Sequence, residues 1–581
     1  TMKLTDVLAL ILKKNNIKNV FGLQGGAVVH IFDSLEKYKF NVTYTPHEQT
    51  ASLAAVANAK VNENIGCVVV TTGPACTNAM TGLLAAWQDS VPCIFISGQS
   101  RSNHTSYNKK VRQTGTQEVN ICDIVKPITK YASFVKNKNN FQEELTKALS
   151  IAISGRPGPV WLDIPLDIQW SEINYNKKYK VSKILQNNFV SNSKMDNFLK
   201  LCKNSKKPLI LMGYGCRLSD PKIANIKYFI SKNKIPFVST WNTKDFFPSN
   251  HKLNLGTIGM SGQRGANKAM FEADLIICLG SHLSIPHTTT LYKNYAPRSK
   301  KIIVNIDKDQ LKNLNVKFDL KICTDIKQFL FKIKNKKLFN RLSWQNLEYL
   351  KQINWANPKK TKKINSDFFI NKLSNALPSN SCIVVDGGGT ALYSGFQSTI
   401  VKANQRIICS SAISSMGTGL AESIGCYKSG KFKKIVCIIG DGSLLMNIQD
   451  LETIKQYKMN ISIILVNNNG YLAIRHTQKE FLKGRYYGTN PKGNLTMPNF
   501  ESVSKAFGLS YLKVKKYNQV KQAINRIMKY KFPIVCEIIT SKTQSSLFKQ
   551  GYKKLDNGQF SPQPLNEMHP FFTKSVSNTN N

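Results

Sequence analysis

The sequence predicts an α/β protein built from three doubly wound domains, each with a parallel β-sheet. Short apolar runs, such as Ile435 to Ile439 and Ile461 to Val466, are typical of parallel strands that helices cover on both faces. Between these two runs, apolar residues recur at helical spacing, so the segment reads as a βαβ unit. A chain of 581 residues and 65.3 kDa exceeds what one hydrophobic core can hold, and roughly three to four domains are expected.

The recurrence of this pattern sets the predicted domain boundaries. In the middle of the chain, one apolar run follows Lys207 and another ends at Asp307, which indicates a separate α/β unit. The segments near 171–190 and 335–365 are rich in Lys, Asn and Ser, as linkers between domains tend to be. The predicted domains are residues 1–170, 188–345 and 363–545, followed by a tail at 546–581.

The first domain begins with an amphipathic helix, whose apolar residues recur at helical spacing between Leu4 and Leu12. A strand is predicted from Val42 to Thr45, and a helix of small residues from Ala51 onward. His47-Glu48 stands between them. A lone glutamate at a helix start is ordinarily a solvated residue that the helix dipole favours, so Glu48 alone indicates no function.

In the third domain, the residues from Gly440 to Asn468 place metal-seeking side chains at the ends of two neighbouring strands. Asp441 follows the first strand, and Asn467-Asn468-Asn469-Gly470 follows the second, with one predicted helix between them. Right-handed crossover puts these side chains next to each other at the carboxyl edge of the sheet. One carboxylate, one amide oxygen and one backbone carbonyl suit Mg²⁺, with phosphate and water oxygens completing the octahedron. The alternative is an ordinary βαβ unit with a polar turn.

The chain carries Gly-Asp-Gly at 440–442 and Asn-Asn at 467–468, with 24 residues between them. This pattern resembles the signature of thiamine-diphosphate enzymes. The strand, His47-Glu48 and the alanine-rich helix are similar to the arrangement in acetolactate-synthase-like enzymes. The chain is thus identified as resembling the catalytic (large) subunits of acetolactate synthases and acetolactate-synthase-like proteins. Three further segments match that family's amino-terminal domain in order: Val20 to Ala27, Thr72 to Asn78 and Ser154 to Pro159.

The resemblance implies a pyrimidine-binding first domain, a central domain and a diphosphate-binding third domain. Glu48 would be the catalytic residue, because it would protonate the aminopyrimidine of thiamine diphosphate. Asp441, Asn468 and the main-chain oxygen of Gly470 would bind Mg²⁺, and the run of three asparagines allows this register to shift by one residue. The other implied cofactor-binding residues are Gly389, Thr390, Met416, Gly417, Gly442, Ser443, Tyr471 and Leu472, and the implied substrate residues are Gly25, Gln117 and Gln478.

Met416 would wedge between the two cofactor rings and force the coenzyme into a bent shape. A core methionine is the alternative, because methionine commonly fills gaps in cores.

In the family, the glutamate and the metal segment of one site come from different subunits. The resemblance therefore implies a homodimer or a homotetramer.

The implied activity is decarboxylation of a 2-oxo acid such as pyruvate, followed by carboligation of the resulting enamine to a carbonyl acceptor. A simple 2-oxo acid decarboxylase or lyase is one alternative, and a non-catalytic scaffold that retained the fold is another. A scaffold would need neither Glu48 nor Asp441. Residues 280–284 lack the arginine and paired aspartates that help to hold FAD in the family, while Asp307 remains. Gln478 stands near the position of a family tryptophan that shapes the acceptor pocket. The first departure leaves FAD binding undecided, and the second leaves the identity of the acceptor undecided.

The net charge of +47, from 81 Lys and Arg against 34 Asp and Glu, at face value suggests a polyanionic partner. Lysine and asparagine are abundant throughout, however, and no zinc-finger, homeodomain or basic-zipper pattern is present, so we predict no specific nucleic-acid partner. The 13 cysteines show no zinc spacing and read as core residues of a reducing compartment. No apolar segment approaches a membrane-spanning length, and we predict a cytoplasmic protein without a membrane partner.

Overall fold

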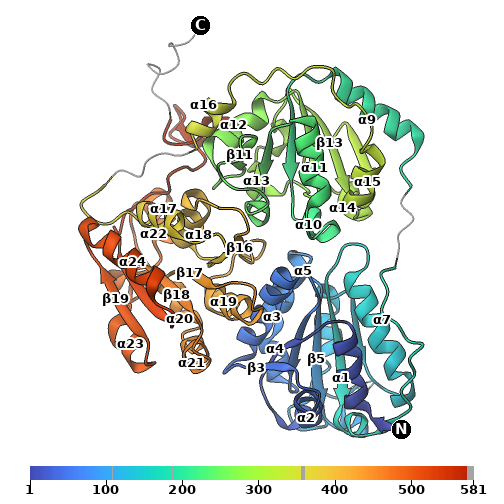
Figure 1. Ribbon diagram of the computed structural model, residues 1–581. Coiled ribbons are helices and arrows are strands. Elements are labelled where there is room, and N and C mark those ends of the chain that lie inside the picture. The colour runs from blue at the N-terminus through green and yellow to red at the C-terminus, as the bar shows by residue number, and fades with distance from the viewer. Residues whose placement is uncertain (108, 185–188, 355–359, 572–581) are drawn as a thin grey trace.

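The computed structural model describes the chain except for residues 108, 185–188, 355–359 and 572–581. Three six-stranded parallel sheets follow one another along the chain, and helices flank each sheet (Figure 1). This confirms the predicted fold class. Parts of both predicted linkers and the end of the predicted tail lie outside the described residues.

The first sheet has the strand order β3-β2-β4-β5-β7-β6, and all neighbouring strands are parallel. In chain order, its strands are β2 (Asn19–Gly22), β3 (Asn41–Tyr44), β4 (Gly66–Val70), β5 (Cys93–Gln99), β6 (Tyr131–Phe134) and β7 (Pro159–Pro165). Its helices are α1 (Leu4–Lys14), α2 (Val29–Lys37), α3 (Glu48–Asn62), α4 (Pro74–Asn78), α5 (Met80–Gln88), α6 (Ile121–Val125), α7 (Phe141–Ile153) and α8 (Leu166–Gln169). The short strands β1 (Met2–Lys3) and β8 (Glu172–Ile173) pair beside it.

The second sheet has the order β11-β10-β9-β12-β13-β14 and is also parallel throughout. Its strands are β9 (Pro208–Met212), β10 (Phe237–Ser239), β11 (Asn254–Thr257), β12 (Leu275–Leu279), β13 (Lys300–Asn305) and β14 (Leu320–Cys323). Its helices are α9 (Asn192–Asn204), α10 (Gly215–Ser219), α11 (Ala224–Asn233), α12 (Arg264–Glu272), α13 (Ile285–Thr288), α14 (Lys308–Lys312), α15 (Ile326–Ile333) and α16 (Leu347–Gln352).

The third sheet has the order β16-β15-β17-β18-β20-β19. Its strands are β15 (Ser381–Val385), β16 (Arg406–Ile408), β17 (Lys434–Gly440), β18 (Ile461–Asn467), β19 (Ser510–Val514) and β20 (Ile534–Ile539). Its helices are α17 (Ser366–Ala376), α18 (Gly389–Ser398), α19 (Thr418–Lys428), α20 (Asp441–Met446), α21 (Asp450–Gln456), α22 (Leu472–Phe481), α23 (Phe500–Ala506) and α24 (Val520–Lys529). A hairpin of β21 (Tyr552–Lys554) and β22 (Phe560–Pro562) lies in the tail.

Each sheet has one point at which the strand order reverses, and parallel α/β sheets bind ligands in the crevice outside the strand ends at such points. In the first sheet, this point lies between β2 and β4, and in the second between β9 and β12. In the third sheet it lies between β15 and β17, the strand that Asp441 follows. The topology thus places the metal segment at the favoured position.

One part of the sequence prediction was wrong. A single helix was expected between Asp441 and the asparagine run, but the structure has two helices, α20 and α21, with a break at Asn447. The Asn447 side chain explains the break, because its amide donates to Gly417 O at 2.6 Å and so leaves the helical path. The break ties this segment to the glycine loop in front of α19.

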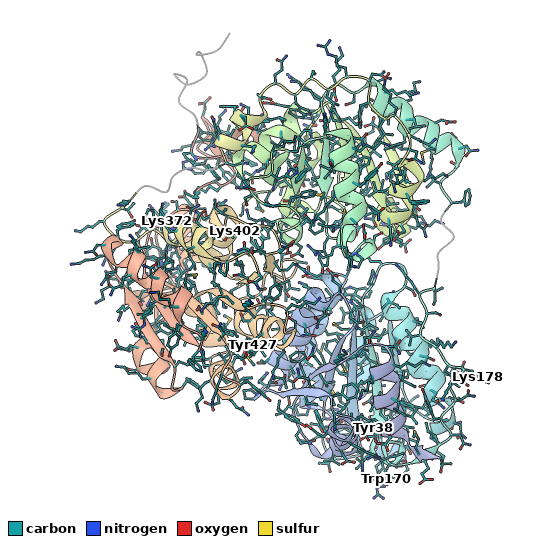
Figure 2. All side chains as sticks on the ribbon, in the orientation of Figure 1. Tyr38, Trp170, Lys178, Lys372, Lys402 and Tyr427 are labelled. Carbon is teal, nitrogen blue, oxygen red and sulfur yellow. The ribbon has the colours of Figure 1, made fainter. Side chains whose placement is uncertain are left out.

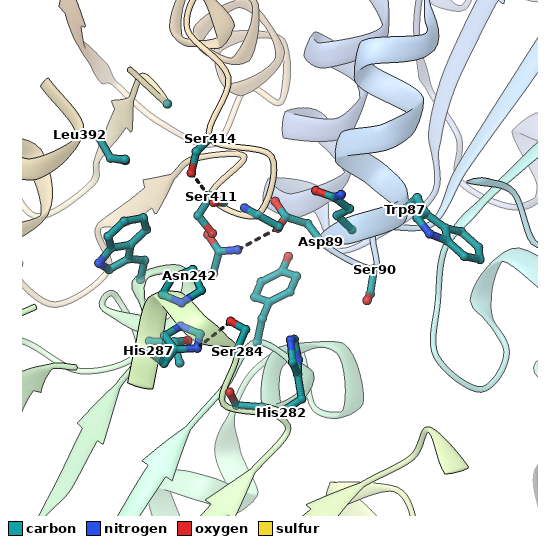
Figure 3. Close-up of a pocket in the computed structure, with 18 of the residues that line it drawn as sticks. Trp87, Asp89, Ser90, Asn242, His282, Ser284, His287, Leu392, Ser411 and Ser414 are labelled. Carbon is teal, nitrogen blue, oxygen red and sulfur yellow. Dashed lines mark hydrogen bonds between the residues drawn. The ribbon is translucent and has the colours of Figure 1, made fainter. Parts of the chain in front are cut away.

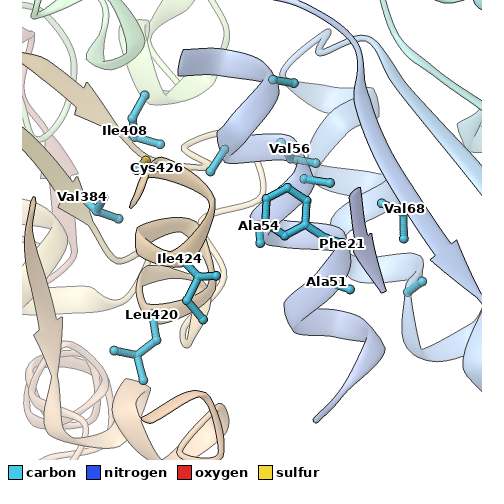
Figure 4. Close-up of a cluster of buried hydrophobic side chains, with 14 of the residues drawn as sticks. Phe21, Ala51, Ala54, Val56, Val68, Val384, Ile408, Leu420, Ile424 and Cys426 are labelled. Atoms are coloured by element: carbon cyan, nitrogen blue, oxygen red, sulfur yellow. The ribbon is translucent and has the colours of Figure 1, made fainter. Parts of the chain in front are cut away.

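The first and third domains share one hydrophobic core across the α3–α19 contact (Figure 4). Ala51, Ala54 and Val56 of α3 and Leu420 and Ile424 of α19 all belong to this core, and all are fully buried. The alanines and Gly425 allow this close approach, because a Cβ on Gly425 would lie 2.0 Å from Ala54 O.

We expect Gly425→Ala to destabilise the protein by about 1–3 kcal/mol, the usual cost of overpacking a core. In an ordinary helix, the same change stabilises by about 0.5–1 kcal/mol, so the sign of the effect tests the contact. Thermal and urea unfolding measure it. Gly26→Ala is the control, since a Cβ there meets nothing within 4 Å. A Gly425→Ala protein more stable than the wild type would contradict the close packing.

Buried ion pairs join the three domains. Asp245 of the central domain pairs with Arg406 of the third at 2.7 Å and with Arg217 at 3.0 Å. Arg217 also lies 3.4 Å from Glu63, which follows α3 in the first domain. Such a network costs desolvation energy but is specific in geometry, because an uncompensated charge left by misalignment would be strongly destabilising. It fixes the relative positions of the walls of the cavity described below.

Surface charge is spread over the molecule. Figure 2 shows Lys178 on the first domain, far from Lys372 and Lys402 on the third. The 13 cysteines are free thiols, and all except Cys323 are buried, as the sequence predicted. Among the described helices, none combines the length and apolarity that crossing a membrane would require.

Candidate functional site

A cavity of about 1340 Å³ lies where the three domains meet. The loops after β15, β17 and β18 form one wall, and the loops after β9, β12 and β13 form the opposite wall. Residues 87–90 and 154–157 of the first domain close one side. Figure 3 shows side chains from all three domains reaching into this space.

Asp441 directly follows β17, and its side chain is almost completely buried at the cavity wall. Gly442 N donates to its Oδ1 at 2.8 Å, and Gly470 N donates to its Oδ2 at 3.0 Å. The second bond joins the ends of β17 and β18, which are neighbouring parallel strands. The predicted proximity of Asp441 and the asparagine loop is therefore present.

Electrostatics at Asp441 favour a bound cation. Burial raises the pKa of Asp441 to about 6, although the Gly470, Gly442 and Asn469 amides and the charge of Arg475 act in the opposite direction. Among the described residues, Asp441 forms no ion pair, so its negative charge has no direct counter-charge. A bound cation supplies one and favours the ionised carboxylate.

The loop after β18 brings the other two predicted metal ligands to the same wall. Asn468 is buried and lines the cavity together with Gly470. Gly470 has φ +125°, and a Cβ there would lie 2.2 Å from Thr489 O, so only glycine fits this loop. In the described part of the chain, no three His, Cys, Asp or Glu side chains gather into a metal site. The carboxylate of Asp441, the side-chain amide oxygen of Asn468 and the Gly470 carbonyl are oxygens of the kinds that Mg²⁺ accepts.

Arg475 holds this loop in place, a role that the sequence did not reveal. Its Nη2 donates to Asn468 O at 2.9 Å and to Asn468 Oδ1 at 3.3 Å, and its Nη1 donates to Asn469 O and Thr489 O at 3.1 and 2.9 Å. The side chain is buried on α22. The sequence shows a positively charged residue, Arg475, four positions after Tyr471. It does not show which carbonyl groups this side chain contacts.

Glycine segments bring the backbone to the cavity wall beside Asp441. A Cβ on Gly388 would lie 2.4 Å from Ser443 Oγ and 2.8 Å from Met416 Cγ. A Cβ on Gly442 would lie 2.2 Å from the Tyr471 ring. Because these positions carry no side chain, the backbone itself forms the wall here and a ligand can approach it closely. The predicted residues that line the cavity here are Gly389, Thr390, Met416, Gly442, Ser443, Tyr471 and Leu472.

Asp386 organises these glycine loops from behind. Its Oδ2 accepts from Gly388 N at 2.9 Å, and its Oδ1 accepts from Gly419 N at 3.0 Å. Asp386 is fully buried, and burial raises its pKa. Gly417, a predicted cofactor residue, does not line the cavity; it has φ +87° and precedes α19. The sequence showed Asp386 at a strand end, but its link to Gly419 depends on a contact between distant segments.

Glu48, Gly25 and Gln117 lie elsewhere, at the carboxyl edge of the first sheet. None of the three lines the cavity. Glu48 begins α3 and is 7% exposed, and Asn78 Nδ2 donates to its Oε2 at 3.0 Å. Gln117 is exposed with φ +57°, and its backbone lies against Gly73 in the loop after β4. The structure thus separates the predicted site residues into two groups on one chain.

Gln478 is likewise not brought to the cavity. Its Nε2 donates to Tyr487 O at 2.9 Å, and its Oε1 accepts from Thr489 Oγ1 at 2.8 Å. The side chain is 7% exposed. Both ends of its amide are therefore used within the protein, where they support the loop next to Gly470.

Three family descriptions match successive parts of the chain. They are "Thiamine pyrophosphate enzyme, N-terminal TPP binding domain" over residues 2–124, "Thiamine pyrophosphate enzyme, central domain" over residues 195–333, and "Thiamine pyrophosphate enzyme, C-terminal TPP binding domain" over residues 387–538. Each match falls on one of the three sheets.

Curated relatives are similar over nearly the whole length. The "Acetolactate synthase large subunit" of Cyanidium caldarium is 31% identical, and the alignment covers 93% of this chain and 94% of that protein. The same-named protein of Buchnera aphidicola subsp. Schizaphis graminum is 30% identical, with coverages of 87% and 89%. The "Acetolactate synthase isozyme 2 large subunit" of Escherichia coli K12 is 26% identical, with coverages of 91% and 93%.

Proposed function

This chain belongs to the thiamine pyrophosphate enzyme family, and we propose that it is an acetolactate-synthase-like carboligase. It decarboxylates a 2-oxo acid such as pyruvate and joins the remaining two-carbon unit to a carbonyl acceptor. The observation that carries the proposal is the wall at which Asp441, Asn468 and Gly470 lie beside glycine loops with accessible backbone.

The residues present fit the coenzyme and its metal ion. Asp441, the Asn468 amide oxygen and the Gly470 carbonyl would bind Mg²⁺, and the Asp441 carboxylate has no direct counter-charge without it. Backbone N–H groups in the first turns of α18 and α20, next to Gly388 and Gly442, would bind the diphosphate. When bound, thiamine diphosphate supplies a thiazolium carbon that takes up the electron pair released by decarboxylation.

Glu48 would hold a proton at the ring nitrogen of the aminopyrimidine. Its carboxylate is buried, and Asn78 binds one oxygen, which fixes its orientation. General acid–base groups work best when they are positioned in this way. Met416 lines the cavity and would pack against the coenzyme rings.

We further propose that the working unit is a homodimer, or a homotetramer built as a dimer of dimers, with shared sites. Glu48 and Asp441 do not face one cavity within the chain, so a second copy has to bring its Glu48 edge to the Asp441 wall. Large apolar side chains are exposed next to that wall, which is typical of an unpaired interface. They are Met446, Ile474, Phe481, Leu482 and Tyr487.

Mixing two inactive variants tests the shared site. Glu48→Gln and Asp441→Ala subunits should recover about a quarter of the wild-type activity when mixed equally, because a random hybrid dimer has one intact site of two and half of all dimers are hybrids. Activity after subunit exchange is measured against each variant alone. Proven exchange without any recovery would rule out sites completed across subunits.

FAD is the one cofactor that the sequence left open. Asp307, the retained carboxylate, already accepts from Asp309 N and Gln310 N, and Arg156 Nη1 donates to it at 3.1 Å. Residues 280–284 contain no Asp, Glu, Lys or Arg, and their one titratable side chain at the cavity is His282. We therefore propose that the reaction does not depend on FAD. Flavin fluorescence of the denatured protein, and activity of flavin-free protein, measure this directly.

Products analysed by mass distinguish the carboligase from the simple decarboxylase. With thiamine diphosphate, Mg²⁺, pyruvate and a panel of carbonyl acceptors, a carboligase releases CO₂ and forms a compound that contains the acceptor plus the two-carbon unit. A decarboxylase releases acetaldehyde, whatever acceptor is added. No CO₂ release from pyruvate, or from other 2-oxo acids offered in its place, would contradict both activities.

The domain boundaries and the cytoplasmic location stay predictions.

A further inference from the structure

The cavity is larger than a binding site for one small molecule usually is. Its volume of about 1340 Å³ exceeds the roughly 300–1,000 Å³ that is typical of a site for one small molecule. Opposite the residues proposed to bind the coenzyme lies a surface that we call the central-domain wall. It consists of Asn242, His282, Ser284 and His287.

The central-domain wall offers hydrogen-bonding groups to the cavity. Ser284 Oγ and His287 Nδ1 are 3.2 Å apart, which fixes the ring, and among the described residues no partner stands opposite His287 Nε2. Asn242 Nδ2 donates to Asp89 Oδ1 at 3.4 Å, which leaves the Asn242 carbonyl oxygen unused within the described chain. Figure 3 shows these side chains in the space opposite Ser411 and Ser414 of the third domain.

The wall is polar but uncharged near neutral pH. Burial lowers the pKa of His287 to about 4, with His282 adding to the effect, and burial also lowers the pKa of His282. A neutral imidazole has one N–H donor and one acceptor nitrogen, so each ring can bind a hydroxyl group in either role. The segment from Gly280 to Thr290 contains no Lys or Arg, and Arg156, the cation that acts on His282, is already paired with Asp307 at 3.1 Å.

Resting on the proposed function, we propose that the central-domain wall is the acceptor subsite and selects a carbonyl compound that carries neighbouring hydroxyl groups. Neutral donors and acceptors complement hydroxyl groups, whereas a second 2-oxo acid would place an unpaired carboxylate against them. In the ligation, a bond forms between the two-carbon unit and the acceptor's carbonyl carbon. Carbon dioxide has left pyruvate by then, and the acceptor oxygen takes a proton from water. The hydroxyl group of the two-carbon unit then loses a proton and the bond between that unit and the coenzyme breaks, which returns the electron pair to the coenzyme and releases the ligated product.

Competition between two aldehydes tests the subsite. Glyceraldehyde carries two hydroxyl groups and propanal carries none, and both are offered with pyruvate to the thiamine-diphosphate-loaded enzyme. We expect wild-type kcat/KM to favour glyceraldehyde over propanal, and His287→Phe to lower that ratio by about tenfold, the worth of one neutral hydrogen bond. His287→Asn, which keeps a donor and an acceptor, should recover part of the ratio.

His251→Phe is the matched control. His251 belongs to the same domain, packs against Phe237 and Phe247, and does not line the cavity, so the ratio should not change. An equal loss with both aldehydes in His287→Phe, or wild-type preference for propanal or for a second pyruvate, would overturn the subsite while CO₂ release still supports the proposed function. Absence of any CO₂ release from 2-oxo acids would overturn both.

Discussion

Glu48→Gln should lower turnover by about 10²- to 10⁴-fold, the usual worth of a positioned proton-transfer group, while the coenzyme stays bound. Glutamine fills the same space and can still bond to Asn78, but it cannot share a proton with the aminopyrimidine. Binding persists because the diphosphate and Mg²⁺ anchor the other end of the coenzyme, at Asp441. Steady-state kinetics and coenzyme titration by calorimetry measure the two effects separately.

The control for this variant is Glu143→Gln, which changes an exposed glutamate of the same domain and should leave turnover unchanged. Wild-type turnover in Glu48→Gln would reduce Glu48 to a helix-start residue. A loss of coenzyme binding together with turnover would instead mean that the glutamate supports the fold of the site and not its proton transfer.

Asp441→Ala should abolish retention of thiamine diphosphate and Mg²⁺ after dialysis, with a fall in affinity of more than about 100-fold. Residues that only orient metal ligands usually cost 10- to 100-fold, and Asp441 is proposed to bind the metal itself. The change also removes acceptors from Gly442 N and Gly470 N, so a second variant is needed. Asp441→Asn keeps the volume and one acceptor oxygen, and loses the charge that binds the cation.

Metal content by atomic emission and coenzyme content by fluorescence follow both variants. Asp309→Ala is the control, because Asp309 also lines the cavity but lies on its central-domain side. It should retain the coenzyme, which separates a specific ligand from the general charge of the cavity. Retention equal to the wild type in Asp441→Ala would remove the metal assignment.

The proximity of Asp441 and the asparagine run could be predicted from the sequence because it depends on two neighbouring strands alone. Apolar runs determine β17 and β18, crossover handedness makes them neighbours, and Asp441 and Asn468 then meet at one edge without reference to any distant segment. The position of Glu48 at a helix start was also predictable, from the strand before it and the small-residue helix after it, whereas its proposed role came from the family resemblance alone. The break at Asn447 was not, because it depends on Gly417, which belongs to another loop.

Features that depend on contacts between domains could not be predicted. The family resemblance implied that Glu48 and Asp441 of one chain serve different sites, but the residues alone do not show it, because the separation follows from how α3 packs on α19. Gln478 was expected near the acceptor. In the structure, its amide donates to Tyr487 O and accepts from Thr489 Oγ1, so both ends are bonded within the protein. The central-domain wall was not predicted either, since His287 carries no local sequence pattern and lies across the cavity from third-domain residues only in the folded chain.

Deuterium exchange at the thiazolium C2 position of the bound coenzyme tests the central claim without requiring the natural acceptor to be known. The measurement mixes the loaded enzyme with D₂O, quenches at short times and reads the remaining proton by NMR. The account predicts that exchange on the wild-type enzyme is much faster than in free thiamine diphosphate, and that Glu48→Gln slows exchange in parallel with turnover. Exchange on the wild-type enzyme no faster than in free coenzyme would contradict it.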